Sequence, residues 1–137
     1  MRMIFVNLPV ADLQASTAFY TALGFTRNPN FSDGTASCMI VSEQIYVMLL
    51  THEKFKGFIN GEIADPKRTK EVLNCLSASG RDEVDGFKAK ALAAGGPNGN
   101  PIWKWVPCTA AASKTRTAMS GKSCIWTCLP ADGLRHL

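Results

Sequence analysis

A short apolar strand followed by an amphipathic helix occurs twice in this chain of 137 residues, and this repeat limits the folds open to it. The first unit spans residues 3–24, and the second spans residues 71–96. Matching positions lie 68 residues apart: Leu8 with Leu76, and Phe19 with Phe87. Because one strand–helix unit has no partner for its apolar face, the repeat predicts two similar modules that share a core.

The first unit continues into three further extended segments. Residues 3–10 are predicted as a strand, and Asp12 offers a side-chain oxygen to the first amides of a helix predicted over residues 13–23. Gly24 supplies the left-handed end of that helix. The extended segments that follow are predicted at residues 25–30, 35–41 and 45–50. The order is therefore strand, helix, strand, strand, strand.

The second unit begins in the same way. Residues 71–78 are predicted as a strand, and Ser79 with Asp82 three residues later resembles a capping box. A helical apolar stripe then runs from Val84 to Leu92. Between the two units, residues 51–68 lack a hydrophobic period and contain glycine and proline, which predicts a linker arm.

Length and a hydrophobic content of 46% fit one domain of class α+β rather than two independent domains. We predict a single domain over residues 1–137 that has four parts. These are a first module at 1–50, the linker arm at 51–68, the start of a second module at 69–96, and a tail at 97–137 of different composition. The tail holds all three tryptophans.

The formal charge of +4 arises wholly in the tail, because residues 1–96 contain ten basic and ten acidic side chains. Dispersed charges of this kind predict no nucleic-acid partner. No apolar run approaches the roughly 18 residues of a membrane span, and no signal-peptide pattern opens the chain. We therefore expect a cytoplasmic protein with no membrane contact. Its five cysteines have no metal-site spacing, and Cys38 and Cys75 are expected to be inert buried thiols.

Three stretches carry a family resemblance: Val6-Asn7-Leu8-Pro9-Val10-Ala11-Asp12-Leu13, followed by Phe19-Tyr20 and Leu23-Gly24-Phe25. They resemble the vicinal oxygen chelate superfamily, which includes glyoxalase I, bleomycin resistance proteins and extradiol dioxygenases, and especially its predicted lactoylglutathione lyases. The resemblance extends through residues 48–55 and 81–85 to Gly96. It implies paired βαβββ modules that form a curled mixed sheet around a cavity, and a homodimer.

The superfamily usually closes its second module with a segment like MYGRSFxDPDGHxWEV, and the tail contains no such segment. The genetic code permits one in another frame. When every codon boundary of residues 105–127 is moved back by one base, the codons are compatible with MGAMYGRSFKDPDGHVWEVMYMD. We therefore predict a frame shift near Gly96 and an incomplete second module. The alternative is a genuinely divergent tail.

Members of the superfamily hold a divalent metal with His, Glu or Gln side chains on inward-facing strand positions, and the metal polarises substrate oxygens. By position, the resemblance places these ligands at Phe5, Met48, Leu73 and Lys122. None of these side chains binds such a metal well. We therefore assign no metal ligand and expect no cofactor.

Side chains of the same strand parity are expected to face the cavity and to bind a ligand: Phe5, Asn7, Tyr46, Met48, Leu73 and Cys75. An apolar lining with few polar groups suits a small organic molecule. The alternative is that these side chains only fill the core. His52 and Glu53 follow the last strand of the first module, either as proton-transfer groups or as ordinary loop residues. No catalytic residue is assigned.

Two functions remain open at this point. The first is metal-independent binding or sequestration of a small organic molecule, as the resemblance to bleomycin resistance proteins implies. The second is a metal-dependent lyase or dioxygenase of the same superfamily, which would need a divalent metal and other ligands than those placed above. The metal content of the purified protein separates the two.

Overall fold

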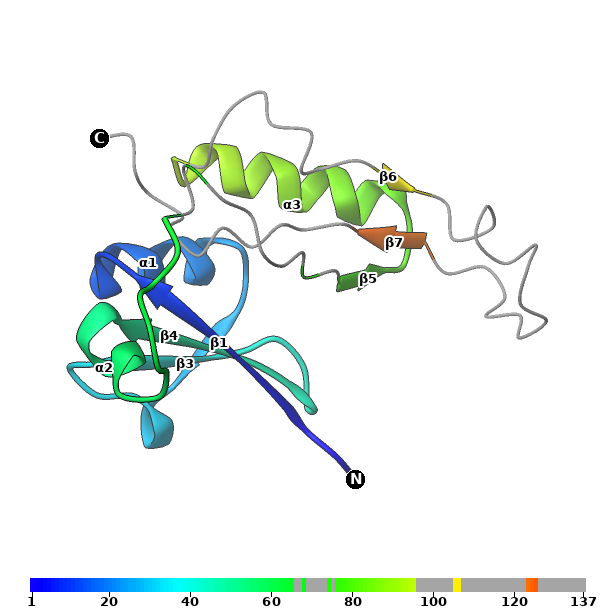
Figure 1. Ribbon diagram of the computed structural model, residues 1–137. Helices are drawn as coiled ribbons and strands as arrows, with labels where there is room; N and C mark the ends of the chain where they lie inside the picture. The colour runs from blue at the N-terminus through cyan, green and yellow to red at the C-terminus, as the bar shows by residue number, and fades with distance from the viewer. Residues whose placement is uncertain (66–67, 69–73, 75, 96–104, 107–122, 126–137) are drawn as a thin grey trace.

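The computed structural model describes residues 1–65, 68, 74, 76–95, 105–106 and 123–125, and the statements below concern these residues (Figure 1). The elements follow in the order β1 (Ile4–Val10), α1 (Leu13–Ala22), β2 (Thr26–Asn28), the 3-10 helix η1 (Pro29–Phe31), β3 (Ala36–Ile40), β4 (Ile45–Thr51), α2 (His52–Lys56), β5 (Leu76–Ala78), α3 (Arg81–Ala93), β6 (Trp105–Val106) and β7 (Ser123–Ile125).

The first module is a mixed four-stranded sheet with the strand order β1-β4-β3-β2. Strands β1 and β4 pair in parallel, and the pairs β3–β4 and β2–β3 are antiparallel. The sheet does not close on itself, so β1 and β2 are its two edges. The predicted α+β class and the βαβββ order of the first module are confirmed.

Helix α1 begins and ends where its sequence signals predict. The Asp12 side chain accepts a hydrogen bond from the Ala15 amide at 3.0 Å, which satisfies one of the free N–H groups of the first turn. The chain leaves the helix through Gly24 at a φ of 101°, a conformation that residues with a Cβ rarely adopt.

The segment after α1 is only partly the strand that was predicted. Strand β2 stops at Asn28, and residues 29–31 form η1 instead of continuing the extended chain. Pro29 occupies the first turn, where its missing N–H costs nothing, and the Asn28 side chain accepts from the Asn30 amide at 3.0 Å. This cap and this proline favour a helical turn over a longer strand.

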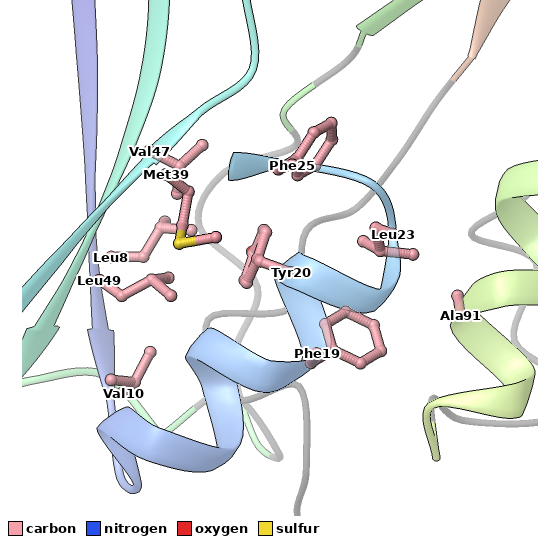
Figure 2. Packing of buried hydrophobic residues seen from close by; sticks show 10 residues of the cluster. All are labelled: Leu8, Val10, Phe19, Tyr20, Leu23, Phe25, Met39, Val47, Leu49 and Ala91. Atoms are coloured by element: carbon pink, nitrogen blue, oxygen red, sulfur yellow. The ribbon is translucent and has the colours of Figure 1, made fainter. Parts of the chain in front are cut away.

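The main core lies between α1 and one face of the sheet (Figure 2). Met39, Leu49 and Tyr20 are at most 1% exposed. The other buried members of this core are Leu8, Val10, Phe19, Leu23, Phe25, Val47 and Ala91. The half-buried Thr17 hydroxyl bridges the two layers by donating to the Ser37 hydroxyl at 2.9 Å. Burial of these side chains is what holds α1 on the sheet.

The second unit contributes β5 and α3, and α3 packs on the first module through Ala91 and Phe87. The rings of Phe87 and Phe25 lie 5.9 Å apart between centroids. Strand β5 pairs with β7, and β7 pairs with β6, in a separate three-stranded sheet. Residues 71–73 and 75 of the predicted strand lie outside the described residues, as do all tail positions except those of β6 and β7.

Two local expectations need correction. The partner of Ser79 at the start of α3 is Glu83, not Asp82: the Glu83 carboxylate accepts from the Ser79 amide at 2.6 Å and from its hydroxyl at 2.7 Å. The segment predicted as a linker begins with a helical turn, α2, because the Thr51 hydroxyl caps it by accepting from the Lys54 amide. In the part of the chain that is described, no helix is long and apolar enough to cross a membrane.

Candidate ligand-binding face

Strands β1 and β4 bring four of the predicted ligand-binding side chains together. In their parallel register Phe5 lies beside Tyr46, and Asn7 lies beside Met48. Side chains alternate along a strand, and the intervening residues Leu8, Val47 and Leu49 point toward α1 (Figure 2). The four side chains therefore share the opposite side of the sheet, which we call the open face: Phe5, Asn7, Tyr46 and Met48. The predicted Leu73 and Cys75 lie outside the described residues.

Exposure changes across this side of the sheet. Phe5 is 42% exposed and Asn7 is also exposed, whereas Tyr46 and Met48 are half-buried. Cys38 of β3, which pairs with Met48, is fully buried. The sheet is thus covered near β3 and open toward β1. Phe5 and Asn7 do not fill the core that the described residues form.

The centre of the open face is a pair of stacked aromatic rings. The centroids of Phe5 and Tyr46 are 4.8 Å apart and their planes differ by 12°. The Tyr46 hydroxyl donates to the Glu43 carbonyl at 3.1 Å, which anchors the far end of its ring. This hydrogen bond and the neighbouring strands hold the two rings in one orientation, so a flat apolar surface exists before any ligand arrives.

Asn7 supplies the polar group of the open face. Its side-chain amide nitrogen donates to the Phe5 carbonyl at 3.1 Å. This bond ties the Asn7 side chain to the strand that carries the exposed ring. A carboxamide beside an aromatic surface is the kind of isolated polar group that orients a small ligand in an apolar site.

His52 and Glu53 are not brought to the aromatic pair. Both lie in the first turn of α2, directly after β4 ends at Thr51. Thr51 lies five positions after Tyr46 along β4, or about 17 Å away at the rise of an extended chain. His52 is half-buried and Glu53 is exposed. Proton transfer by these two residues to a ligand on the rings stays a prediction without support from the geometry.

Cys38 has the surroundings expected of an inert thiol. It is fully buried, and burial raises the pKa of its thiol, which keeps the reactive thiolate scarce. Within the part of the chain that the structure describes, no positively charged neighbour offsets this effect by lowering the thiol pKa. Cys38 is therefore a buried packing residue of β3 and not placed to serve as a nucleophile.

The side chains at the metal-ligand positions do not fit a divalent ion. Phe5 has no donor atom and its ring is engaged with Tyr46, and the Met48 thioether is a soft, weak ligand. Positions 73 and 122 lie outside the described residues. Across the described part of the chain, no group of three or more His, Cys, Asp or Glu side chains is placed to hold a metal ion.

Strand β3 adds residues to this side of the sheet that strand parity alone did not identify. Ile40 pairs with Tyr46, and Cys38 pairs with Met48. Residues 35–41 were predicted as a strand, but the register in which this strand pairs with the next was not, and only the register says which residues meet. The short turn between the two strands fixes this register and was the sequence signal from which it could have been predicted.

Comparison with known proteins agrees with this architecture. Residues 2–42 match the family model described as bleomycin resistance protein-like N-terminal. The solved structure of the hypothetical protein SA1046 from S. aureus is similar to this chain, with a TM-score of 0.60 and 27% sequence identity, over 77% of this chain and 82% of that protein. No curated protein sequence gives a significant match.

Proposed function

Since this chain opens with a bleomycin-resistance-like module of the vicinal oxygen chelate superfamily, we propose that its open face binds a small organic molecule without a metal ion. The stacked pair of Phe5 and Tyr46 is the observation that carries this proposal. An aromatic ring left 42% exposed on a sheet face, with a carboxamide beside it, presents apolar area and one orienting group together.

A flat, unsaturated ligand gains most from this surface. An offset-stacked ring adds about 0.5–1.5 kcal/mol beyond the apolar area that it buries. The Met48 side chain lies beside Asn7, and its flexible thioether adapts to ligand shape. Binding of this kind sequesters a molecule and requires no chemistry from the protein.

The donor chemistry argues for binding over metal-assisted catalysis. Superfamily enzymes act through an ion that polarises substrate oxygens, and the two ligand positions that the structure describes hold Phe5 and Met48. A metal-dependent lyase or dioxygenase would have to draw its ligands from elsewhere in the chain. We therefore propose that apolar contacts and ring stacking provide the affinity for the ligand.

A ligand screen on the purified chain tests the proposal. Aromatic and aliphatic compounds are compared by the rise in unfolding temperature that each produces, and the best binders are titrated by calorimetry. We expect flat aromatic compounds to bind, and Tyr46→Ala to weaken that binding about tenfold or more, which is about 1.4 kcal/mol. Ile45→Ala is the matched control, because Ile45 adjoins Tyr46 on the same strand but points to the opposite side of the sheet.

The same samples separate binding from metal-dependent catalysis. We expect affinity to be unchanged by a chelator and metal analysis to find no stoichiometric ion. Stoichiometric nickel, zinc, manganese or iron, or ligand binding that survives Tyr46→Ala unchanged, overturns the proposal.

Thiol chemistry supports a cytoplasmic location for this activity. The chain has five cysteines, and Cys38 is a free thiol packed in the interior. Free thiols persist in a reducing compartment. We propose that the protein binds its ligand in the cytoplasm, and localisation of a tagged full-length chain tests this.

A further inference from the structure

The Phe5 carbonyl determines which way the Asn7 side chain is turned. A backbone carbonyl oxygen only accepts hydrogen bonds, so the Asn7 atom that lies 3.1 Å from it is the amide nitrogen, Nδ2. The reverse orientation would place two acceptors against each other. The amide oxygen, Oδ1, accepts no hydrogen bond from the described residues. Asn7 therefore presents mainly an acceptor to its surroundings, because Oδ1 keeps both lone pairs while Nδ2 keeps one N–H.

The face of the Phe5 ring that Tyr46 leaves uncovered is turned away from β4. Tyr46 lies beside Phe5 in the register of the two strands, and the rings are 4.8 Å apart with 12° between their planes. Tyr46 thus covers the face of the Phe5 ring that is nearer to β4. Phe5 is 42% exposed. A flat ligand that stacks on the other face continues the stack of rings.

The Asn7 carboxamide lies on this same side of β1. The Ile4 amide donates to the Gln44 carbonyl at 2.8 Å, which directs the main-chain groups of Ile4 toward β4. Backbone direction alternates along a strand, so the Phe5 carbonyl points away from β4. Because Nδ2 of Asn7 bonds to that carbonyl, the carboxamide is held on the side toward which the uncovered ring face is turned.

The spacing of the ring and the carboxamide fits a flat ligand with two fused rings. Phe5 and Asn7 are two positions apart on β1, or roughly 7 Å at the rise of an extended strand. A pair of fused rings has about this length. One ring of such a ligand stacks on Phe5 while the edge of the other ring reaches Asn7.

We propose that Asn7 makes the open face selective for flat two-ring ligands that carry an N–H or O–H donor. The ligand stacks on the uncovered face of Phe5, and its donor bonds to Oδ1 of Asn7. This inference rests on the proposed function, because it names the class of small organic molecule that the same face binds. Phe5 and Tyr46 supply affinity for any flat ring, and Asn7 distinguishes one flat ring from another.

A ligand that has only acceptors is disfavoured at this position. A ring oxygen or a carboxylate has no proton to donate, so it meets Oδ1 acceptor to acceptor and loses its hydrogen bonds to water. A ligand N–H instead exchanges its bond to water for a bond to Oδ1. Since the Phe5 carbonyl already holds the Asn7 side chain, ligand binding immobilises little that is free.

Indole and benzofuran test the selectivity on the unsubstituted full-length chain. The two molecules have the same shape and differ in one ring atom, an N–H in indole and an oxygen in benzofuran. In titrations followed by protein NMR spectra, we expect indole to bind about three- to tenfold more tightly, the effect of one hydrogen bond. Equal affinities overturn the selectivity and leave the proposed binding function standing. Absence of binding by both molecules overturns the proposed function as well.

Three substitutions assign the preference to Asn7. Asn7→Leu removes the acceptor and keeps a side chain of similar size, so indole and benzofuran should then bind with equal affinity. Met48→Leu is the matched control, because Met48 lies beside Asn7 and its replacement should leave the preference unchanged. Phe5→Leu should weaken both ligands by the same factor, since its main-chain carbonyl still holds Asn7. A preference for indole that persists in folded Asn7→Leu, or that is lost in Met48→Leu, overturns the proposal.

Discussion

The hydroxyl group of Tyr20 is the least well satisfied polar atom that the structure describes. Tyr20 is 1% exposed, its ring lies edge-on to Phe19 at 5.7 Å and stacks on Phe25 at 6.2 Å, and its oxygen has no hydrogen-bond partner among the described residues. Burial raises the pKa of this phenol far above its usual value, so the group stays neutral. The ring is required for packing, whereas the oxygen costs free energy.

Tyr20→Phe should therefore stabilise the protein, by about 1 kcal/mol, because a buried unpaired hydroxyl costs about 1–3 kcal/mol of desolvation. Tyr46→Phe is the matched control: its hydroxyl is bonded to the Glu43 carbonyl, so its removal should cost up to about 1 kcal/mol. Urea unfolding of both variants measures the difference. A loss of stability in Tyr20→Phe would show that the hydroxyl has a partner.

At the scale of elements, α1 and α3 could be predicted from sequence, whereas α2 lies in the segment predicted as a linker. Asp12 and Gly24 bound α1, and both act as expected. β2 was less predictable, because Pro29 and the Asn28 cap compete with strand extension over only a few residues. The start of α3 offered two nearby acidic residues, and sequence spacing selected Asp82 where the geometry selects Glu83.

Replacement of Glu83 by alanine should destabilise α3 more than replacement of Asp82, by about 0.5–1.5 kcal/mol, the net contribution of a typical hydrogen bond. Both acids lie in the first turn and favour its dipole equally, but only Glu83 bonds to Ser79. Comparison of the two variants by urea unfolding isolates the hydrogen bonds from the charge. Equal losses in the free energy of unfolding would show that the hydrogen bonds to Ser79 do not stabilise the protein.

This contribution should also depend on pH. The hydrogen bonds from Ser79 lower the pKa of Glu83 below its usual value. A carboxyl group with a lowered folded-state pKa stabilises the protein above its unfolded pKa, about 4.3, and loses that effect as pH falls through the folded value. The difference between the unsubstituted chain and Glu83→Ala should therefore be largest near neutral pH and shrink in acid.

At the scale of the whole molecule, the sequence could predict which side chains share the open face but not how they pack there. Alternation along each strand identified Phe5, Asn7, Tyr46 and Met48 as candidates for one side of the sheet, and the structure brings these four together. The stack of Phe5 on Tyr46 and the cover over Cys38 depend on register and on packing between distant segments. Neither is a property of a single strand, so neither was visible in the sequence.

The frame shift predicted near Gly96 also concerns the whole molecule, because it would decide whether the second module is complete. DNA sequencing across this junction should find that a one-base shift restores the ending MYGRSFKDPDGHVWEV. A chain with that ending should complete the second module and unfold at a higher temperature, since each 1 kcal/mol gained raises the midpoint of a domain this size by roughly 4 °C. Scanning calorimetry of the two chains measures the gain. If no one-base shift of the coding sequence gives this ending, the prediction is wrong and the tail is a genuine, divergent segment.

The parallel pairing of β1 with β4 has a consequence for how the chain folds. Ile4 meets Ile45, 41 positions later, whereas β3 and β4 are joined by a short turn. Closing the longer loop costs more entropy, so the β3–β4 hairpin forms early and β1 is added late. During synthesis, an apolar strand therefore leaves the ribosome well before its own partner exists. A soluble partner fused to the N-terminus, next to residues 1–5, should then raise the yield of folded protein more than the same partner fused to the C-terminus. Expression at low temperature should also raise this yield.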